Sequence, residues 1–342
     1  MHGYVPWVRL APLTTLRLGG PARALVEARS EDELVETVLR GGEEVVPLAG
    51  GSNVVVADEG LDATVVRVLT RGVSMSRDGD DVVVRAAAGE PWDALVDRCV
   101  AEGLAGIECL AGIPGSTGAT PIQNVGAYGQ EIADTLAAVR VLDRRTGAIE
   151  ELPPQACRFG YRTSAFKRDP GHRVVLEVAL RLRRATVSGP IRYGELARAL
   201  DAAPGEGAPL ADVREAVLAL RRRKGMVLDP DDHDTWSAGS FFTNPFVAPG
   251  DLPEGAPAFP QPDGTVKTSA AWLIEQAGFR KGYGDPRGIA ISSKHTLALT
   301  NRGAGTTSQL VALAREIADG VRERFGVRLQ PEPVFLGHAW PG

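Results

Sequence analysis

The chain has 342 residues, of which 44% are hydrophobic and 24% charged, and it carries a net charge of -5. This length predicts two domains or one domain with a large elaboration, and the composition is that of an ordinary soluble globular protein. A negative net charge gives no bulk attraction to nucleic acid or anionic lipid, so we expect neither as a partner.

Cysteine usage and the absence of export signals favour a cytoplasmic protein. Cys99, Cys109 and Cys157 are odd in number and not closely paired, which suits a reducing compartment. The first residues lack the basic end and apolar run of a signal peptide, and no segment approaches the length of a membrane span. The five histidines are scattered, so we expect no metal site.

The first half of the sequence predicts strands with helices between them. Strands are expected at 15–18 and 22–28 around a Gly-Gly-Pro turn, and again at 45–48 and 54–57 around a glycine-rich turn. Ser30 should cap a helix with Glu33 as its reciprocal partner, and Gly41 and Gly42 should end it. Further strands are expected at 64–68, 81–88, 137–143 and 172–184, with a helix from Pro91 at its first position.

The stretch 106–132, "GIECLAGIPGSTGATPIQNVGAYGQEI", is too irregular for a helix or strand and too apolar for a flexible linker. A long loop of this kind inside a compact domain is usually a binding loop. The chain has no GxGxxG after a strand and no P-loop. Backbone N–H groups in "LAGGSNV" and in the long loop could bind anionic oxygens, which favours a pyrophosphate ligand, although the first loop alone could be a tight turn.

The second half predicts an α+β unit. A helix is expected over 210–225, and its run Arg221–Lys224 is interpreted as a solvated helix end, with phosphate binding as the alternative. A helix near 270–277, a strand near 296–301, a long amphipathic helix from Thr307 and a last strand complete the chain.

Two side chains stand out on chemical grounds. Arg162, between aromatic and hydroxyl residues, could be rigid enough to polarise a carboxylate, whereas Lys167 is interpreted as an exposed cation. Glu332 is framed by two prolines before an apolar strand, which fits either a functional position or structural punctuation.

Six motifs, in order, resemble those of the UDP-N-acetylenolpyruvoylglucosamine reductases, the MurB flavoenzymes of peptidoglycan synthesis. They are "TTLRLGG", "PLAGGSNVVV", "GIPGSTGATPIQNVGAYG", "FGYRTSAFK", "SAGSFFTNP" and "LQPEPVFLG". The resemblance implies an α+β fold with an FAD-binding region of the vanillyl-alcohol-oxidase type over 1–185, in subdomains of about 1–68 and 69–185. A C-terminal substrate-binding domain over 186–342 would follow.

The resemblance also implies the reaction and its residues. NADPH would reduce non-covalently bound FAD, which would reduce the enolpyruvyl ether of a UDP-sugar, without an obligate protein partner. Ser240 would donate the proton, and Arg162 and Glu332 would bracket the substrate carboxylate. FAD contacts are expected at Gly50, Gly51, Ser52, Asn53, Gly112, Ile113, Gly115, Ser116 and Gly118, and substrate contacts at Tyr128, Tyr193, Lys224, Asn244 and His295. The "IRYGEL" segment around Tyr193 matches the branch in which a tyrosine segment folds over the substrate.

Two other functions stay open at this point. Another FAD oxidase of the same superfamily would share the N-terminal loops but not "GSFFTNP" with "QPEP". A nucleotide-sugar binding module without catalysis is disfavoured because Arg162, Ser240 and Glu332 are all present.

Overall fold

The computed structural model describes residues 5–203 and 205–341, which form two compact units. Among these described residues, the first unit comprises 5–8, 22–50, 62–203 and 205–223, and the second comprises 9–21, 51–61 and 224–341. Residues 186–223 therefore pack with the first unit, unlike the expected boundary after residue 185. The assignment of cofactor and substrate to separate domains stays a prediction.

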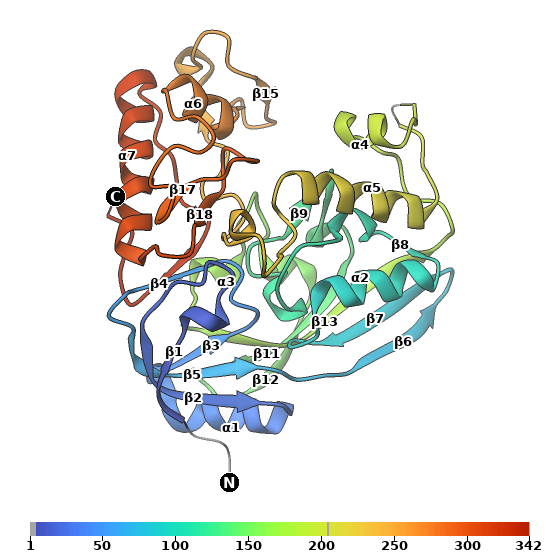
Figure 1. Cartoon of the computed structure of the whole chain (residues 1–342). Helices are drawn as coiled ribbons and strands as arrows, with labels where there is room; N and C mark the ends of the chain where they lie inside the picture. Colours follow the sequence, from blue (N-terminus) through green and yellow to red (C-terminus); the bar gives the residue numbers. More distant parts are fainter. Residues whose placement is uncertain (1–4, 204, 342) are drawn as a thin grey trace. The chain divides into compact units, whose positions relative to one another are not determined.

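A four-stranded sheet and one helix open the first unit (Figure 1). The strand order is β1 (Val5–Arg9), β2 (Pro21–Ala28), β5 (Leu61–Val68), β3 (Val45–Leu48), and β3 runs parallel to β5. Helix α1 (Glu31–Gly41) has the predicted capping box between Ser30 and Glu33, and Gly42 ends it with φ +52°. This part of the sequence prediction is confirmed.

A larger antiparallel sheet forms the rest of the first unit. Its order is β12 (Ile149–Leu152), β11 (Leu136–Asp143), β13 (Arg173–Arg184), β7 (Asp81–Ala87), β6 (Val73–Asp78), and β8 (Leu104–Ala105) also pairs with β13. Val178, Leu180 and Leu182 of β13 are fully buried, as expected for the apolar face of a central strand.

The remaining elements of the first unit are short or helical. They are α2 (Trp92–Ala101), α3 (Ala165–Arg168), α4 (Gly194–Ala199), α5 (Leu210–Arg223) and the hairpin of β9 (Gly126–Ala127) with β10 (Gln130–Glu131). Pro91 caps α2 with extended backbone dihedrals, so it lies one position before the helical position expected from the sequence.

The second unit combines small sheets with two helices. Strand β4 (Val54–Val56) pairs in parallel with β19 (Val334–Leu336), β17 (Ile289–Ile291) pairs with β18 (Leu299–Asn301), and β16 (Val266–Lys267) lies between β14 (Phe246–Val247) and β15 (Phe259–Pro260). The helices are α6 (Ala270–Gln276) and α7 (Thr307–Phe325). In the described part of the chain, no helix is long and apolar enough to cross a membrane.

The core of the second unit contains residues from distant parts of the sequence. Phe241 and Phe242 are each 1% exposed and pack edge to face, with ring centroids 5.1 Å apart. Leu16 and Leu18 belong to the same cluster, although the strand expected at 15–18 does not form. The alternation of apolar residues there reflects burial of two leucines in this core, so the strand prediction was wrong.

Asp58 fastens residues 51–61 to the N-terminus of α7. Its Oδ1 accepts a hydrogen bond from the Thr307 N–H, and its Oδ2 accepts from the N–H and the hydroxyl of Ser308, at 2.7–2.8 Å. Burial raises the pKa of Asp58, but the hydrogen bonds from Ser308 and Thr307 outweigh burial and leave the pKa below its ordinary value. A carboxylate at a helix N-terminus also interacts favourably with the helix dipole.

We expect Asp58→Asn to lower the free energy of unfolding by about 1 kcal/mol at neutral pH, because it removes this charge from the helix N-terminus. Since the folded pKa is depressed, the contribution is complete above the unfolded pKa and is lost as pH falls through the folded pKa. Urea unfolding at pH 7 and at pH 3 checks both statements. Asp62→Asn, at a carboxylate that is 88% exposed, is the matched control; equal losses in the two variants would contradict the prediction.

Candidate active site

The glycine-rich loop of the first unit is tied to the start of α2 and the end of β7. The Gly112 N–H donates to Asp93 Oδ1 at 2.6 Å, and the Gly118 N–H donates to the Ala88 carbonyl at 2.9 Å. Between these anchors, no described residue accepts a hydrogen bond from the N–H groups of Ile113, Gly115 or Ser116. Pro114 has no N–H, so only Gly115 and Ser116 present adjacent uncommitted donors, with Ile113 on the other side of the proline. Adjacent uncommitted N–H groups on a fixed loop can bind an anion.

The two predicted cofactor loops touch within the first unit through Gly50. A Cβ at Gly50 would lie 2.6 Å from the Gly115 Cα, closer than real Cβ atoms approach backbone. Gly115 itself has φ +120°, which a side chain rarely tolerates. Glycine is therefore required at both positions for the loops to pack backbone against backbone.

The other residues of the first cofactor loop belong to the second unit. The Gly51 carbonyl accepts from the Thr15 N–H at 3.0 Å, and the half-buried Ser52 follows it. The Asn53 carbonyl accepts from the Val334 N–H at 2.9 Å, and the Asn53 amide donates to the Glu332 carbonyl at 3.5 Å. The loop is thus fixed by the segment that carries Glu332.

Ser240 and Glu332 lie on adjacent backbone segments of the second unit. The Glu332 N–H donates to the Phe241 carbonyl at 2.8 Å, and Phe242 forms a bridge with Pro331. The Phe241 N–H donates to the Leu297 carbonyl at 2.7 Å. Ser240 and Glu332 are both half-buried, so each combines a fixed backbone with a partly accessible side chain.

Arg162 lies in a tight turn of the first unit. Gly160 and Thr163 exchange backbone hydrogen bonds of 3.0 and 3.2 Å across it, and Arg162 has φ +53°. The half-buried guanidinium donates from Nη2 to the Gly126 carbonyl at 2.6 Å and from Nη1 to the Asn124 carbonyl at 3.4 Å. A left-handed non-glycine residue is strained, and such residues often mark functional positions.

Tyr128 and Tyr193 contact each other in the first unit, with ring centroids 5.5 Å apart and planes at 82°. Burial is the main cause that raises the pKa of Tyr128 to about 12, so its hydroxyl stays protonated at neutral pH. Tyr193 is 49% exposed and directly precedes α4.

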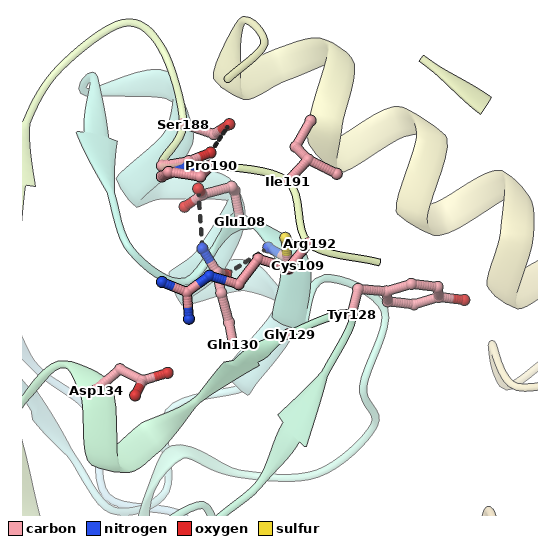
Figure 2. Close-up of a pocket in the computed structure, with 11 residues that line it drawn as sticks. Glu108, Cys109, Tyr128, Gly129, Gln130, Asp134, Ser188, Pro190, Ile191 and Arg192 are labelled. Carbon is pink, nitrogen blue, oxygen red and sulfur yellow. Dashed lines mark hydrogen bonds between the residues drawn. The ribbon is translucent and has the colours of Figure 1, made fainter. Parts of the chain in front are cut away.

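A pocket of about 260 Å³ in the first unit lies beside Tyr128 and the 188–192 segment, which leads to Tyr193 (Figure 2). Gln130 is central to it, since its amide donates to Glu108 at 2.9 Å and its oxygen accepts from the Cys109 N–H at 2.8 Å. The fully buried Glu108 also accepts from the Gly106 N–H at 2.6 Å. The polar groups at the centre of this pocket therefore satisfy one another.

The interpretation of Arg221–Lys224 as a solvated helix end is wrong for Arg221. Its side chain is only 6% exposed, and burial lowers its pKa to about 10. Arg222 and Arg223 are exposed, whereas Lys224 is half-buried in the second unit. The helical repeat turns one arginine of the run inward, and the sequence alone did not reveal which.

The other expected substrate residues, Asn244 and His295, lie in the second unit and are half-buried. Asn244 Oδ1 accepts from the Ala270 N–H at 3.0 Å, at the start of α6. His295 Nδ1 accepts from the Leu297 N–H at 3.2 Å, which leaves Nε2 as the protonated nitrogen of the neutral ring.

Sequence reasoning missed two residues that organise the first unit around the loops. Asp93 holds Gly112, and Asn124 holds the turn that carries Arg162. Asn124 has φ +49°, a conformation that asparagine tolerates better than most residues. Its place in "QNVGAYG", among glycines, was the signal that could have indicated it.

Comparisons with known proteins identify both halves of the chain. Residues 229–336 match the UDP-N-acetylenolpyruvoylglucosamine reductase C-terminal domain, and residues 22–153 match an FAD binding domain. The UDP-N-acetylenolpyruvoylglucosamine reductase of Saccharopolyspora erythraea is 53% identical over 96% of this chain and 94% of its own length. That of Salinispora arenicola is 55% identical over 96% and 95%. The crystal structure of the reductase MurB from Thermus caldophilus covers 98% of this chain and 99% of its own, at 27% identity and a TM-score of 0.67. This chain therefore belongs to the UDP-N-acetylenolpyruvoylglucosamine reductase family.

Proposed function

We propose that the chain is a UDP-N-acetylmuramate dehydrogenase, which uses NADPH and FAD to reduce UDP-N-acetylenolpyruvoylglucosamine to UDP-N-acetylmuramate in peptidoglycan synthesis. The observation that carries this function is identity of 52–55% to named reductases over 96% of the chain. An oxidase of the same superfamily would share only the FAD-binding part.

The first unit fits the phosphates of FAD. The N–H groups of Ile113, Gly115 and Ser116 are uncommitted among the described residues, and Gly50 packs without a side chain against the backbone of Gly115 and Ser116. We propose that these residues, with Gly51, Ser52, Asn53, Gly112 and Gly118, hold FAD non-covalently; Gly112 and Gly118 act through backbone shape, since their own N–H groups are bonded. When bound, FAD would supply to the enolpyruvyl double bond a hydride that originates from NADPH.

Three side chains are proposed to stabilise charge on the substrate and to supply its proton. Addition of hydride to the terminal vinyl carbon leaves electron density on the carbon that bears the carboxylate, and this density requires stabilisation and then a proton. We propose that Ser240 Oγ donates the proton, while Arg162 and Glu332 bracket the carboxylate. A hydroxyl is a weak acid, so the step needs a dry, fixed environment, to which the buried Phe241 and Phe242 contribute.

The remaining substrate contacts are proposed at Tyr128, Tyr193, Lys224, Asn244 and His295. Lys224 would neutralise the diphosphate, and the protonated His295 Nε2 would donate to the substrate. The enzyme would act in the cytoplasm on small molecules alone, without nucleic acid, membrane insertion or an obligate protein partner. By function, the FAD-binding region would comprise residues 1–185 and the substrate-binding domain residues 186–342, so the functional boundary would differ from that of the compact units, in which residues 186–223 pack with the first unit.

Stopped-flow flavin spectroscopy under nitrogen tests the function as a whole. NADPH should reduce the bound flavin, and the enolpyruvyl substrate should reoxidise it. Steady turnover should require both NADPH and the enolpyruvyl substrate. A flavin that the enolpyruvyl substrate fails to reoxidise would favour an oxidase, and a protein that takes up no flavin when incubated with FAD would favour a binding module.

Ser240→Ala should leave flavin reduction by NADPH nearly unchanged and slow reoxidation by the enolpyruvyl substrate about 100- to 10,000-fold, as expected for loss of a proton donor. Both half-reactions are measured by stopped flow. Thr243→Ala, which removes a hydroxyl from the same segment, is the control. Equal slowing of the two half-reactions would count against the role of Ser240.

Arg162→Lys keeps the charge but removes the planar fork, so kcat/KM for the enolpyruvyl substrate should fall about 10- to 100-fold. Arg158→Lys is a close control because Arg158 lies in the same segment, is exposed and also has a left-handed backbone, with φ +45°. Steady-state kinetics with saturating NADPH measure both. Similar losses in the two variants would show that the turn, and not the guanidinium, is responsible.

Gly50→Ala should yield protein that is depleted of flavin, because the new methyl group meets the Gly115 backbone and displaces the loop. The ratio of flavin to protein absorbance measures this. Gly171→Ala, where a Cβ meets nothing within 4 Å, should retain flavin. Full flavin content in Gly50→Ala would refute the proposed packing.

A further inference from the structure

We propose that Asn124 is a positioning residue that orients the Arg162 guanidinium toward the substrate carboxylate. The inference deepens the proposed function and rests on the role given there to Arg162. Asn124 and Arg162 both belong to the first unit, as do Gly126, Glu131 and Gly160.

The backbone of the glycine-rich loop sets the orientation of Arg162. The two terminal nitrogens of the guanidinium donate to the carbonyls of Asn124 and Gly126. A Cβ at Gly126 would lie 2.9 Å from Arg162 Nη1, so the guanidinium lies directly against this backbone. Any shift of the Asn124–Gly126 backbone is therefore transmitted to the guanidinium.

The Asn124 side chain holds that backbone to the turn that carries Arg162. It is 2% exposed, and its Nδ2 donates to the Gly160 carbonyl at 3.4 Å and to Glu131 Oε2 at 2.8 Å. Its Oδ1 accepts from the Ala133 N–H at 3.0 Å. One side chain thus joins the loop, the turn and the segment after β10.

These hydrogen bonds connect Asn124 to the Arg162 turn at two points and so close a ring. The Asn124 side chain bonds to the first residue of the turn, Gly160, while the Asn124 carbonyl accepts from Arg162, two residues further along. The left-handed backbone of Asn124 lets its side chain and its carbonyl both reach the turn. A buried network in which every member is bonded fixes one geometry, and a reactive group misplaced by about 1 Å can cost about 100-fold in rate.

Glu131 supplies the acceptor that fixes the Asn124 amide. The Glu131 side chain also accepts from the Asp134 N–H, and the Asp134 side chain accepts from the Glu131 N–H at 2.8 Å, in a reciprocal capping box. Because Glu131 is held on both sides, it presents Oε2 to Asn124 in a defined place. The pair has a fixed polarity, with the amide as donor and the carboxylate as acceptor.

Asn124→Asp reverses this polarity and tests the inference. It keeps size, tolerance of a left-handed backbone and the acceptor for Ala133, but it places a carboxylate against Glu131. We expect kcat/KM for the enolpyruvyl substrate to fall about 10- to 100-fold, flavin reduction by NADPH to stay within about threefold, and the flavin content to be normal.

The double variant Asn124→Asp with Glu131→Gln restores a bond of opposite polarity. The amide introduced at position 131 can donate to the new carboxylate at position 124, while its oxygen still accepts from the Asp134 N–H. Part of the lost kcat/KM should return, because the bond to position 131 is rebuilt while the bond to the Gly160 carbonyl, which needs a donor at position 124, is not. If Asn124→Asp does not fold, Asn124→Gly replaces it in the test. Glycine keeps the left-handed backbone and places no carboxylate against Glu131, and this variant should show the same loss in kcat/KM.

Combination with Arg162→Lys separates positioning from general destabilisation. If Asn124 acts through Arg162, Asn124→Asp should cost little further kcat/KM in the Arg162→Lys background. Asp143→Asn, which removes a buried, multiply bonded carboxylate from the same unit, controls for lost stability. Urea unfolding should show a loss for Asp143→Asn and for Asn124→Asp, but only the latter should change kcat/KM.

The outcomes distinguish this inference from the proposed function. If Arg162→Lys lowers kcat/KM and the Asn124 variants do not, or if their losses simply add to that of Arg162→Lys, the positioning role of Asn124 is overturned. If Arg162→Lys leaves kcat/KM unchanged, the role of Arg162 fails first and this inference fails with it.

Discussion

The backbone pairing of residues 241–243 with 330–332 is the constraint on which the second unit depends. It consists of the hydrogen bonds from Glu332 to Phe241 and from Thr243 to Gln330, with Phe242 opposite Pro331. The paired segment contains the two buried phenylalanines. Ser240 directly precedes this segment, and Glu332 is bonded to it through the Phe241 carbonyl. The side chains proposed as proton donor and as partner of the substrate carboxylate, Ser240 and Glu332, therefore lie on or beside backbone that is fixed by main-chain hydrogen bonds.

In the first unit the corresponding constraint is the conformation of the glycine-rich loop. Its ends are held by Asp93 and by the Ala88 carbonyl, and its later part, at Asn124 and Gly126, receives the Arg162 guanidinium. One loop thus offers N–H groups to an anion at one end and carbonyls to a cation at the other. This division of backbone donors and acceptors explains why glycine and left-handed residues are concentrated there.

Much of the fold followed from local patterns. The capping box at Ser30, the helix α5 and the strands around the glycine-rich turn were predicted and confirmed, because caps and periodicity act over a few residues. The strand expected at Leu16 and Leu18 was wrong, since two leucines buried in a distant core give the same alternation as a strand. Arg221 was misjudged for a related reason, because which arginine of a run turns inward depends on the helices packed around it.

The sequence by itself determined the family, the cofactor and the identity of the candidate side chains, since these are carried by short motifs whose residue types the chemistry requires. Only the tertiary structure decided that Phe241 and Phe242 are core, that segment 51–61 packs with the C-terminal part of the chain, and that Asn124 joins the loop to the Arg162 turn. These features depend on hydrogen bonds and contacts between residues far apart in sequence. Local propensity contains no information about such pairings, because their free energy arises only when the whole unit is folded.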